Sequence, residues 1–406
     1  MRSLTELYRI GLGPSSSHTM GPHRAAERFL ERHPQAETFE VTLYASLAAT
    51  GKGHLTDLAI HEAFAAKKVE LIWKPNQQLP LHPNGMEFVA IYPDTTRSEV
   101  WQVYSVGGGA IADAESFSPP SIYQFTTMTD ILNHVSSTGQ ALWEYVEEVE
   151  GQELWDFLDD IWETMQRTMQ RGLRAEGVLP GGLGVPRKAC AFQRRAMDAS
   201  GHLRRHGLIS AYALATNEEN AAGHEVVTAP TCGGSGTLPA VLRYTMETFD
   251  TPRESVLRAL ATAGLVGNLI KNNASISGAQ VGCQGEVGAA CSMAAAAATQ
   301  LMGGTPRQVE YAAAMGLEHH LGLTCDPVAG LVQIPCIERN AFAANRAIDC
   351  ADYSLFTDGN HLIPFDEVVQ VMWETGNNLP SLYRETSLGG LAAAYRARPK
   401  PDDKTK

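Results

Sequence analysis

Three of the seven cysteines lie in loops that glycine or proline interrupts, and their thiols could together hold a metal centre. They are Cys283 in VGCQGEVG, Cys325 in LTCDPVAG and Cys336 in IPCIERN. Because turns let the backbone aim several sulfurs at one point, three such thiolates can converge and leave one coordination position open, as a catalytic metal requires. The spacing between them matches no short metal-binding motif, so buried free thiols remain the alternative.

The other four cysteines fit such a site less well. Cys190 and Cys291 lie in helix-like stretches, Cys350 ends another, and Cys232 lies in the loop PTCGGSG. If residues 340–350 are helical, Cys350 stands about 15 Å beyond residue 340, at ~1.5 Å per residue. That is too far along the helix to share one compact cluster easily with Cys336.

Two of the 13 histidines have small neighbours in loop-like sequence: His18 in SSSHT and His54 in TGKGH. Imidazole titrates near neutrality, so a histidine in such a loop can accept or deliver a proton during catalysis. For any single histidine, a place on the surface or in the core without a chemical role is the more common outcome.

Polar side chains that suit a carboxylate ligand flank these histidines and cysteines. They are Ser15, Ser16, Ser17, Thr19, Lys52, Asn273, Ser275 and Ser277. Hydroxyls and loop N–H groups bind anions, but one of the first four can instead cap a helix that begins near Pro22. Lys52 can pair with a carboxylate or lie exposed in a turn. The last three can contact a ligand or form local turns.

The composition excludes several classes of protein. Of the 406 residues, 44% are hydrophobic, which is enough for a large core and excludes wholesale disorder. The net charge is −13 and the basic residues are scattered, which argues against a nucleic-acid partner. No apolar stretch has the length of a transmembrane helix, and the N-terminus lacks an apolar core of signal-peptide length. We therefore expect a cytoplasmic protein with reduced cysteines.

Hydrophobic periodicity divides the chain into two parts and predicts an α+β fold. Residues 1–130 form a small α/β domain, with strands at 39–44, 69–73, 87–92 and 99–106 and helices at 21–33 and 56–67. Residues 131–395 form a larger, mainly α-helical catalytic domain, in which glycine-rich loops separate helices such as 141–172, 253–270 and 340–350. Residues 396–406 are a loose, charged tail.

Long motifs in both parts give the chain a specific resemblance. They are IGLGPSSSHTMGP (10–22), LYASLAATGKGHLTD (43–57), LPLHPNGMEF (79–88), YSVGGGAI (104–111), EGVLPGGLGVPRKA (176–189), TNEENAAGHEVVTAPT (216–231), NASISGAQVGCQGEVGAACSMAAA (273–296), EHHLGLTCDPVAGLVQIPCIERNA (318–341) and YRETSLGGLA (383–392). In this order, nearly end to end, the chain resembles the bacterial iron–sulfur L-serine dehydratases, also called L-serine ammonia-lyases, in their single-chain form.

The resemblance implies a chemistry and a set of residues that carry it. A [4Fe–4S] cluster held by Cys283, Cys325 and Cys336 would leave the fourth iron free to act as a Lewis acid on the substrate hydroxyl. His18 or His54 would take the Cα proton, and the other would orient substrate or relay the proton. No pyridoxal phosphate is needed, and the substrate would be the small molecule L-serine. The family expectation for assembly is a homodimer, without nucleic acid or membrane.

Two alternatives and two departures accompany this interpretation. The same motifs would serve a dehydratase or desulfidase that acts on L-threonine, L-cysteine or a hydroxymethyl dicarboxylate, whereas a non-catalytic sensor would not need the cysteines and histidines. Residues 68–79 look short beside the longer N-terminal domains of the family, which puts an allosteric pocket there in doubt. Some relatives end in a cysteine, whereas this chain ends PKPDDKTK, so we expect the fourth iron to carry no thiolate from the tail.

Overall fold

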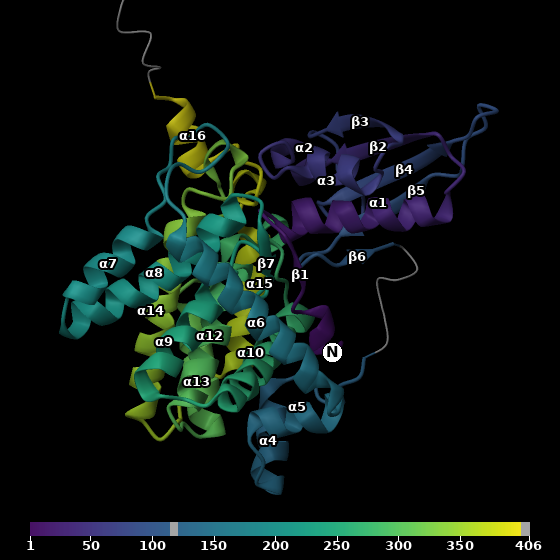
Figure 1. The fold of residues 1–406 in the computed structure, drawn as a ribbon. Helices are drawn as coiled ribbons and strands as arrows, with labels where there is room; N and C mark the ends of the chain where they lie inside the picture. The colour runs from purple at the N-terminus through teal and green to yellow at the C-terminus, as the bar shows by residue number, and fades with distance from the viewer. Residues whose placement is uncertain (114–120, 399–406) are drawn as a thin grey trace, which may run out of the picture.

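A computed structural model of the protein describes residues 1–113 and 121–398. A small sheet with its helices lies beside a larger helical body (Figure 1), which confirms the predicted α+β class. The chain enters the helical body at α4 (Met128–Thr138), close to the predicted division at residue 130, and that division stays a prediction. The helix α16 (Gly390–Arg396) ends where the predicted loose tail begins. Residues 399–406 of that tail lie outside the described residues.

The small part is built on a five-stranded sheet in the order β3-β2-β4-β5-β6, in which only β2 and β3 run parallel. Its strands are β2 (Thr38–Tyr44), β3 (Lys68–Lys74), β4 (Gly85–Ile91), β5 (Trp101–Ser105) and β6 (Ile111–Ala112). Helices α1 (Gly21–Arg32) and α3 (Thr56–Ala63) supply Phe29 and Ile60 to the core that the sheet forms with Phe39 and Phe88. The helix α2 (Ala45–Thr50) follows β2 directly.

The first residues of the chain pack into the helical body before the chain reaches the sheet. Leu4 and Tyr8 belong to the large helical core, and the Tyr8 hydroxyl donates to the Leu260 carbonyl oxygen at 2.9 Å. A short strand β1 (Ile10–Leu12) then pairs antiparallel with β7 (Glu225–Val227). This two-stranded sheet links the two parts, and its strand β1 ends shortly before the SSSHT motif in the sequence.

An alanine-rich helix, α12 (Val287–Leu301), lies at the centre of the helical body. It packs against α9 (Thr237–Phe249), α10 (Arg253–Asn273), α13 (Pro306–Glu318) and α14 (Cys336–Leu355). Alanine side chains are small, so four helices can approach this one closely. The remaining helices are α5 (Leu142–Glu150), α6 (Glu153–Arg174), α7 (Ala189–Asp198), α8 (Gly201–Ala221), α11 (Gly278–Val281) and α15 (Phe365–Asn378).

Two predicted helices differ from the structure in ways that have a physical reason. The helix predicted over 141–172 is two helices, because Gly151 takes a positive φ of 79° and ends α5. The helix predicted over 340–350 is longer: α14 begins at Cys336, which therefore lies at a helix start rather than in a loop.

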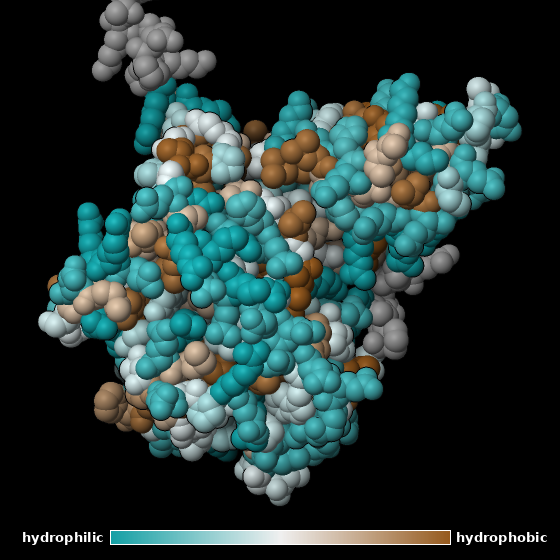
Figure 2. All heavy atoms as spheres, viewed as in Figure 1, coloured by the Kyte–Doolittle hydropathy of each residue, from teal (hydrophilic) through white to brown (hydrophobic). Residues whose placement is uncertain are grey.

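The surface is mostly hydrophilic on the face that Figure 2 shows, with hydrophobic side chains in small groups. Among the helices of the described residues, none combines the length and apolar character that crossing a bilayer requires.

Candidate active site

Cys283, Cys325 and Cys336 line one small cavity at the junction of the two parts, and all three are buried. The cavity is completed by residues from both parts: Pro14, Ser15, His54, Gly233, Glu286, Pro327, Val332 and Glu385. The structure therefore brings together three cysteines that are separated by 42 and 11 positions in the sequence, as 325 − 283 and 336 − 325 show.

Backbone hydrogen bonds hold the cysteine loops in place. The Cys283 N–H donates to the Leu323 carbonyl oxygen at 2.9 Å, so the first loop is tied to the strand-like segment that carries Cys325. The Cys325 N–H donates to the Tyr383 oxygen at 2.8 Å, which ties that segment to the C-terminal part of the chain. Cys336 is the first residue of α14. The three thiols are thus fixed on separately anchored backbone.

The donor set fits an iron–sulfur cluster with three protein anchors. Burial raises the pKa of the Cys283 thiol to about 11, whereas the nearby Arg339 guanidinium opposes that rise. Arg339 itself is held by a hydrogen bond from Nη1 to the Thr324 carbonyl oxygen at 2.6 Å. Thiolates are the ligands that iron–sulfur clusters use, and the adjacent guanidinium favours the thiolate form.

None of the other four cysteines lines this cavity. Cys291 donates to the Ala343 carbonyl oxygen at 3.3 Å, and Cys350 borders a separate pocket with Tyr311 and His319. Cys232 is buried with its sulfur 3.9 Å from the Met20 sulfur. The predicted separation of Cys350 from Cys336 along α14 agrees with these positions.

Glycines of the motifs let the backbone approach a buried carboxylate beside the thiols. A Cβ at Gly233 would lie 2.9 Å from Glu286 Oε1. A Cβ at Gly278 would lie 2.8 Å from Glu286 Oε2 and 3.2 Å from the Cys325 sulfur. Since real Cβ atoms do not come so close, any larger residue at these positions would displace Glu286 from the cavity wall.

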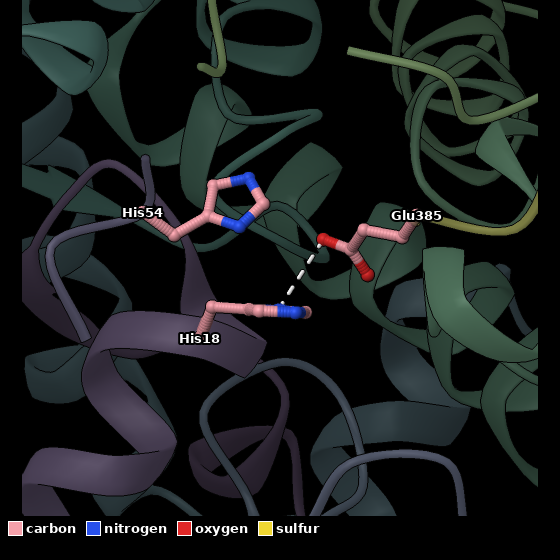
Figure 3. Close-up of side chains that lie close together, drawn as sticks. All are labelled: His18, His54 and Glu385. Atoms are coloured by element: carbon pink, nitrogen blue, oxygen red, sulfur yellow. Dashed lines mark ion pairs between the residues drawn. The ribbon is translucent and has the colours of Figure 1, made fainter. Parts of the chain in front are cut away.

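His18 and His54 form a buried pair next to the thiol cavity, with ring centroids 4.5 Å apart. Figure 3 shows both rings facing Glu385, which comes from the C-terminal segment. His18 Nδ1 lies 2.9 Å from Ser17 Oγ and 3.4 Å from Glu385 Oε1, and His18 Nε2 lies 3.1 Å from Ser46 Oγ. The two histidines that the sequence singled out therefore meet, although His18 lies in a π-helical turn, Ser16–Met20, rather than a loop.

Burial keeps both imidazoles neutral. It lowers the pKa of His18 to about 3 and that of His54 well below its usual range, and a neighbouring imidazole lowers each further: His82 acts on His18, and His18 acts on His54. A neutral imidazole has a free nitrogen that can accept a proton, so either histidine is in the form that a general base needs at neutral pH.

The hydroxyl groups of the SSSHT motif are all buried, and each has a hydrogen-bond partner within the protein. Ser15 Oγ accepts from the His18 N–H at 3.1 Å, which makes Ser15 the cap of the π-helical turn as well as a wall of the cavity. Ser16 Oγ accepts from the Cys232 N–H at 3.4 Å, and Thr19 Oγ1 donates to the His54 carbonyl oxygen at 2.7 Å. These side chains, with Ser17 on His18, position the two histidines.

The structure does not bring Lys52 or Asn273 to the cavity. Lys52 is exposed, with its ammonium 5.8 Å from the centre of the Trp73 ring. Asn273 is exposed at the end of α10, where its Nδ2 donates to the Thr126 carbonyl oxygen at 2.7 Å. Ser275 and Ser277 are buried, and the Ser277 hydroxyl has no partner among the described residues.

Sequence reasoning missed three buried polar residues near the histidines: His82, Asn84 and Glu385. His82 Nε2 and both side-chain polar atoms of Asn84 have no hydrogen-bond partner among the described residues, and one Glu385 oxygen likewise has none. Buried polar groups normally find partners, so such orphans mark places where a ligand belongs. The motifs LPLHPNGMEF and YRETSLGGLA contain these residues, and that was the available signal.

The burial of His82 predicts how stability depends on pH. Burial lowers its pKa to about 4, whereas an unfolded chain has a histidine pKa of about 6.5. Between these values only the unfolded state binds the proton. Each pH unit of acidification in this range therefore lowers the free energy of unfolding by about 1.4 kcal/mol through His82. The full stability is present above about pH 6.5. The variant His82→Asn should show a shallower fall in unfolding free energy, measured by urea titration from about pH 6 to about pH 4.5.

The matched control is His61→Asn, since His61 is exposed in α3 and should leave the slope unchanged. If the wild-type and His82→Asn curves run parallel over this range, His82 is not held neutral by burial.

Comparisons with known proteins agree with this geometry. The family model described as serine dehydratase alpha chain matches residues 57–392, and that described as serine dehydratase beta chain matches residues 3–70. Among curated relatives, the L-serine dehydratase of Haemophilus influenzae and L-serine dehydratase 1 of Escherichia coli are each 41% identical over 97% of this chain and 99% of the relative. The L-serine dehydratase of Streptomyces coelicolor is 41% identical over 96% of this chain and 98% of the relative. With its cavity of three thiols beside two histidines, the chain belongs to the serine dehydratase family and joins the regions of both family chains in a single polypeptide.

Proposed function

We propose that the protein is a [4Fe–4S]-dependent L-serine ammonia-lyase that converts L-serine to pyruvate and ammonia. The observation that carries this proposal is the cavity in which Cys283, Cys325 and Cys336 lie together beside His54. Similarity over nearly the full length to proteins named L-serine dehydratase, at 41% identity, supports the choice of substrate.

The three cysteines would hold the cluster, and the neighbouring residues would handle protons and charge. A [4Fe–4S] cluster, when bound there, would supply a Lewis acid that weakens the bond between Cβ and the departing hydroxyl. His18 or His54 accepts the Cα proton, since both imidazoles are neutral and adjacent. Burial of these groups excludes bulk water from the proton transfer.

Hydroxyls close to the histidines are the best candidates for the substrate carboxylate. Ser15 lines the cavity, and the free hydroxyl of Ser277 lies in the segment that leads to Cys283. Lys52 and Asn273 lie outside the cavity lining, beside Trp73 and the Thr126 carbonyl oxygen, so the proposed site does not include them. After elimination, the enamine product becomes an imine and hydrolyses in water, so no residue is needed for that step.

Three further properties stay proposals. We propose the division of the chain into an α/β domain at 1–130 and a catalytic domain at 131–395, a homodimer as the working assembly, and a cytoplasmic location. The last is supported by the need of an open cluster for reducing conditions. Size-exclusion chromatography with light scattering on the anaerobic holoenzyme tests the dimer.

A substrate panel under anaerobic conditions tests the choice of L-serine. We expect kcat/KM for pyruvate formation from L-serine to exceed that for 2-oxobutyrate formation from L-threonine by at least about 10-fold, because a small enclosed cavity disfavours an added methyl group. L-cysteine and a hydroxymethyl dicarboxylate complete the panel. A higher kcat/KM for any of these would replace L-serine with that substrate, and no turnover of any of them would favour the non-catalytic alternative.

A further inference from the structure

Glu385 is a buried carboxyl group in the wall of the cavity that holds the three thiols. It is 4% exposed and lines the cavity with the three cysteines. One of its oxygens, Oε1, lies 3.4 Å from His18 Nδ1, and the other, Oε2, has no hydrogen-bond partner among the described residues. Figure 3 shows the carboxylate directed at the two histidine rings.

The backbone around Glu385 is held in place from both sides. Its N–H donates to the Cys325 carbonyl oxygen at 2.7 Å, and its own carbonyl oxygen accepts from Ser46 Oγ at 2.8 Å. Glu385 has a φ of 57° and Ser387 a φ of 54°, which side chains other than glycine rarely adopt. Backbone in this region persists only where surrounding contacts enforce it, and such residues gather at functional sites. The position of this carboxylate is therefore determined by the fold.

The charges that face Glu385 do not neutralise it. Glu286 is a second buried carboxylate, and ligand atoms of Glu286, Cys325 and Glu385 all lie within 4.8 Å of one another. The neighbouring imidazoles of His18 and His54 are neutral, and the Arg339 guanidinium is engaged by the thiols. A buried polar atom without a partner is costly, so Glu385 Oε2 is a position for a hydrogen-bond donor of a ligand.

The ammonium group of an amino-acid substrate is a donor of this kind. A 2-amino acid is a zwitterion, and only a few bonds separate its ammonium nitrogen from the hydroxyl on Cβ. A hydroxyl placed near the three thiols therefore puts the ammonium group within the same small cavity, where Glu385 and Glu286 are the carboxylates. Glu286 is already in contact with the Cys325 sulfur at 3.9 Å, whereas Glu385 Oε2 is free.

We propose that Glu385 binds the α-ammonium group of the substrate and so selects amino acids over hydroxy acids. This inference rests on the proposed function, since it assumes that the cavity binds L-serine. It assigns a binding role to a residue that contacts the substrate, and it leaves the proton transfer to His18 or His54.

The test compares two ligands that differ only in the amino group, L-serine and 3-hydroxypropionate, on the anaerobic holoenzyme. The variant is Glu385→Gln, which keeps the shape of the side chain and removes its charge. We expect KM for L-serine to rise about 10- to 100-fold, because a charge-assisted hydrogen bond is lost. The inhibition constant of 3-hydroxypropionate should change by less than about 3-fold, since that ligand never had the contact.

The matched control is Glu310→Gln. Glu310 is a buried glutamate outside the cavity that pairs with His361 Nε2 at 2.6 Å, so its variant should leave both constants unchanged. Glu385→Asp, which keeps the charge on a shorter side chain, should recover part of the affinity for L-serine.

Three results would overturn the inference. Equal changes for the two ligands would mean that Glu385 does not sense the amino group. A fall in kcat with both constants unchanged would mean that Glu385 only positions His18. Loss of iron and of the visible spectrum in Glu385→Gln would make it a ligand of the cluster. Failure of the proposed function would look different, because the wild-type protein itself would then lack the cluster or L-serine turnover.

Discussion

Replacing Cys283, Cys325 or Cys336 with alanine, one at a time, should abolish both cluster retention and L-serine turnover. Each substitution removes one of only three protein anchors, and a cluster held by two thiolates is lost readily. The loops themselves are fixed by backbone bonds such as Cys283 N–H to Leu323 oxygen, so the fold should survive each substitution. The measurements are iron content and visible absorption after anaerobic reconstitution, with circular dichroism to confirm the fold.

Cys350→Ala is the matched control for this series. Cys350 is also buried, and it lies on the same helix α14 as Cys336, but it borders a different pocket. That variant should keep its iron and its activity. If Cys350→Ala loses iron while Cys336→Ala retains it, the assignment of the ligands is wrong.

Replacing His18 or His54 with alanine should lower kcat by about 10²- to 10⁴-fold while the visible spectrum of the cluster survives. The reason is that these two imidazoles are neutral and lie at or next to the cavity, whereas the three thiols are the proposed ligands of the cluster. The measurement is steady-state turnover of L-serine together with the absorption spectrum of each variant.

The two histidine variants can also identify the base. His54 lines the cavity directly, whereas His18 lies behind it against Glu385. The larger fall in kcat should therefore come from His54→Ala, with His18→Ala acting through the orientation of its neighbour. His61→Ala, an exposed histidine of α3, is the control and should turn over normally. Near-normal kcat in both His18→Ala and His54→Ala would remove histidine from the mechanism.

The outline of the fold could be predicted from the sequence because its signals are local. Alternating β-branched and aromatic residues predicted the strand that the structure places at Thr38–Tyr44, and helical periodicity predicted α1 nearly to the residue and the start of α10 at Arg253. The break at Gly151 was missed because helical periodicity continues on both sides of a single left-handed glycine. The pairing of β1 with β7 was also missed, since strands of three residues carry no periodic signal.

The site was predictable only in part, because it is assembled from distant segments. The three cysteines and two histidines could be named from their motifs, and the structure brings these five together. A sequence motif does not show which way a side chain points. The motifs therefore could not separate Lys52 and Asn273, which face solvent, from Ser15, which faces the cavity.

Glu385 is the opposite case, a residue of the site that the sequence did not predict. It lies 367 residues from His18, as 385 − 18 shows, and apart from its place in the motif YRETSLGGLA nothing in the sequence distinguishes its carboxyl group from an ordinary surface charge. Its burial depends on the contact of this segment with Cys325 and Ser46, which only the folded chain reveals.

The most direct test of the proposed iron–sulfur function is a Mössbauer spectrum of the enzyme, reconstituted with ⁵⁷Fe and kept free of oxygen, with and without L-serine. Three cysteine anchors predict a cluster in which one iron differs from the other three, and L-serine should shift the signal of that iron alone. Four equivalent irons that do not respond to L-serine, or a protein that retains no iron, would contradict a three-cysteine cluster that binds substrate.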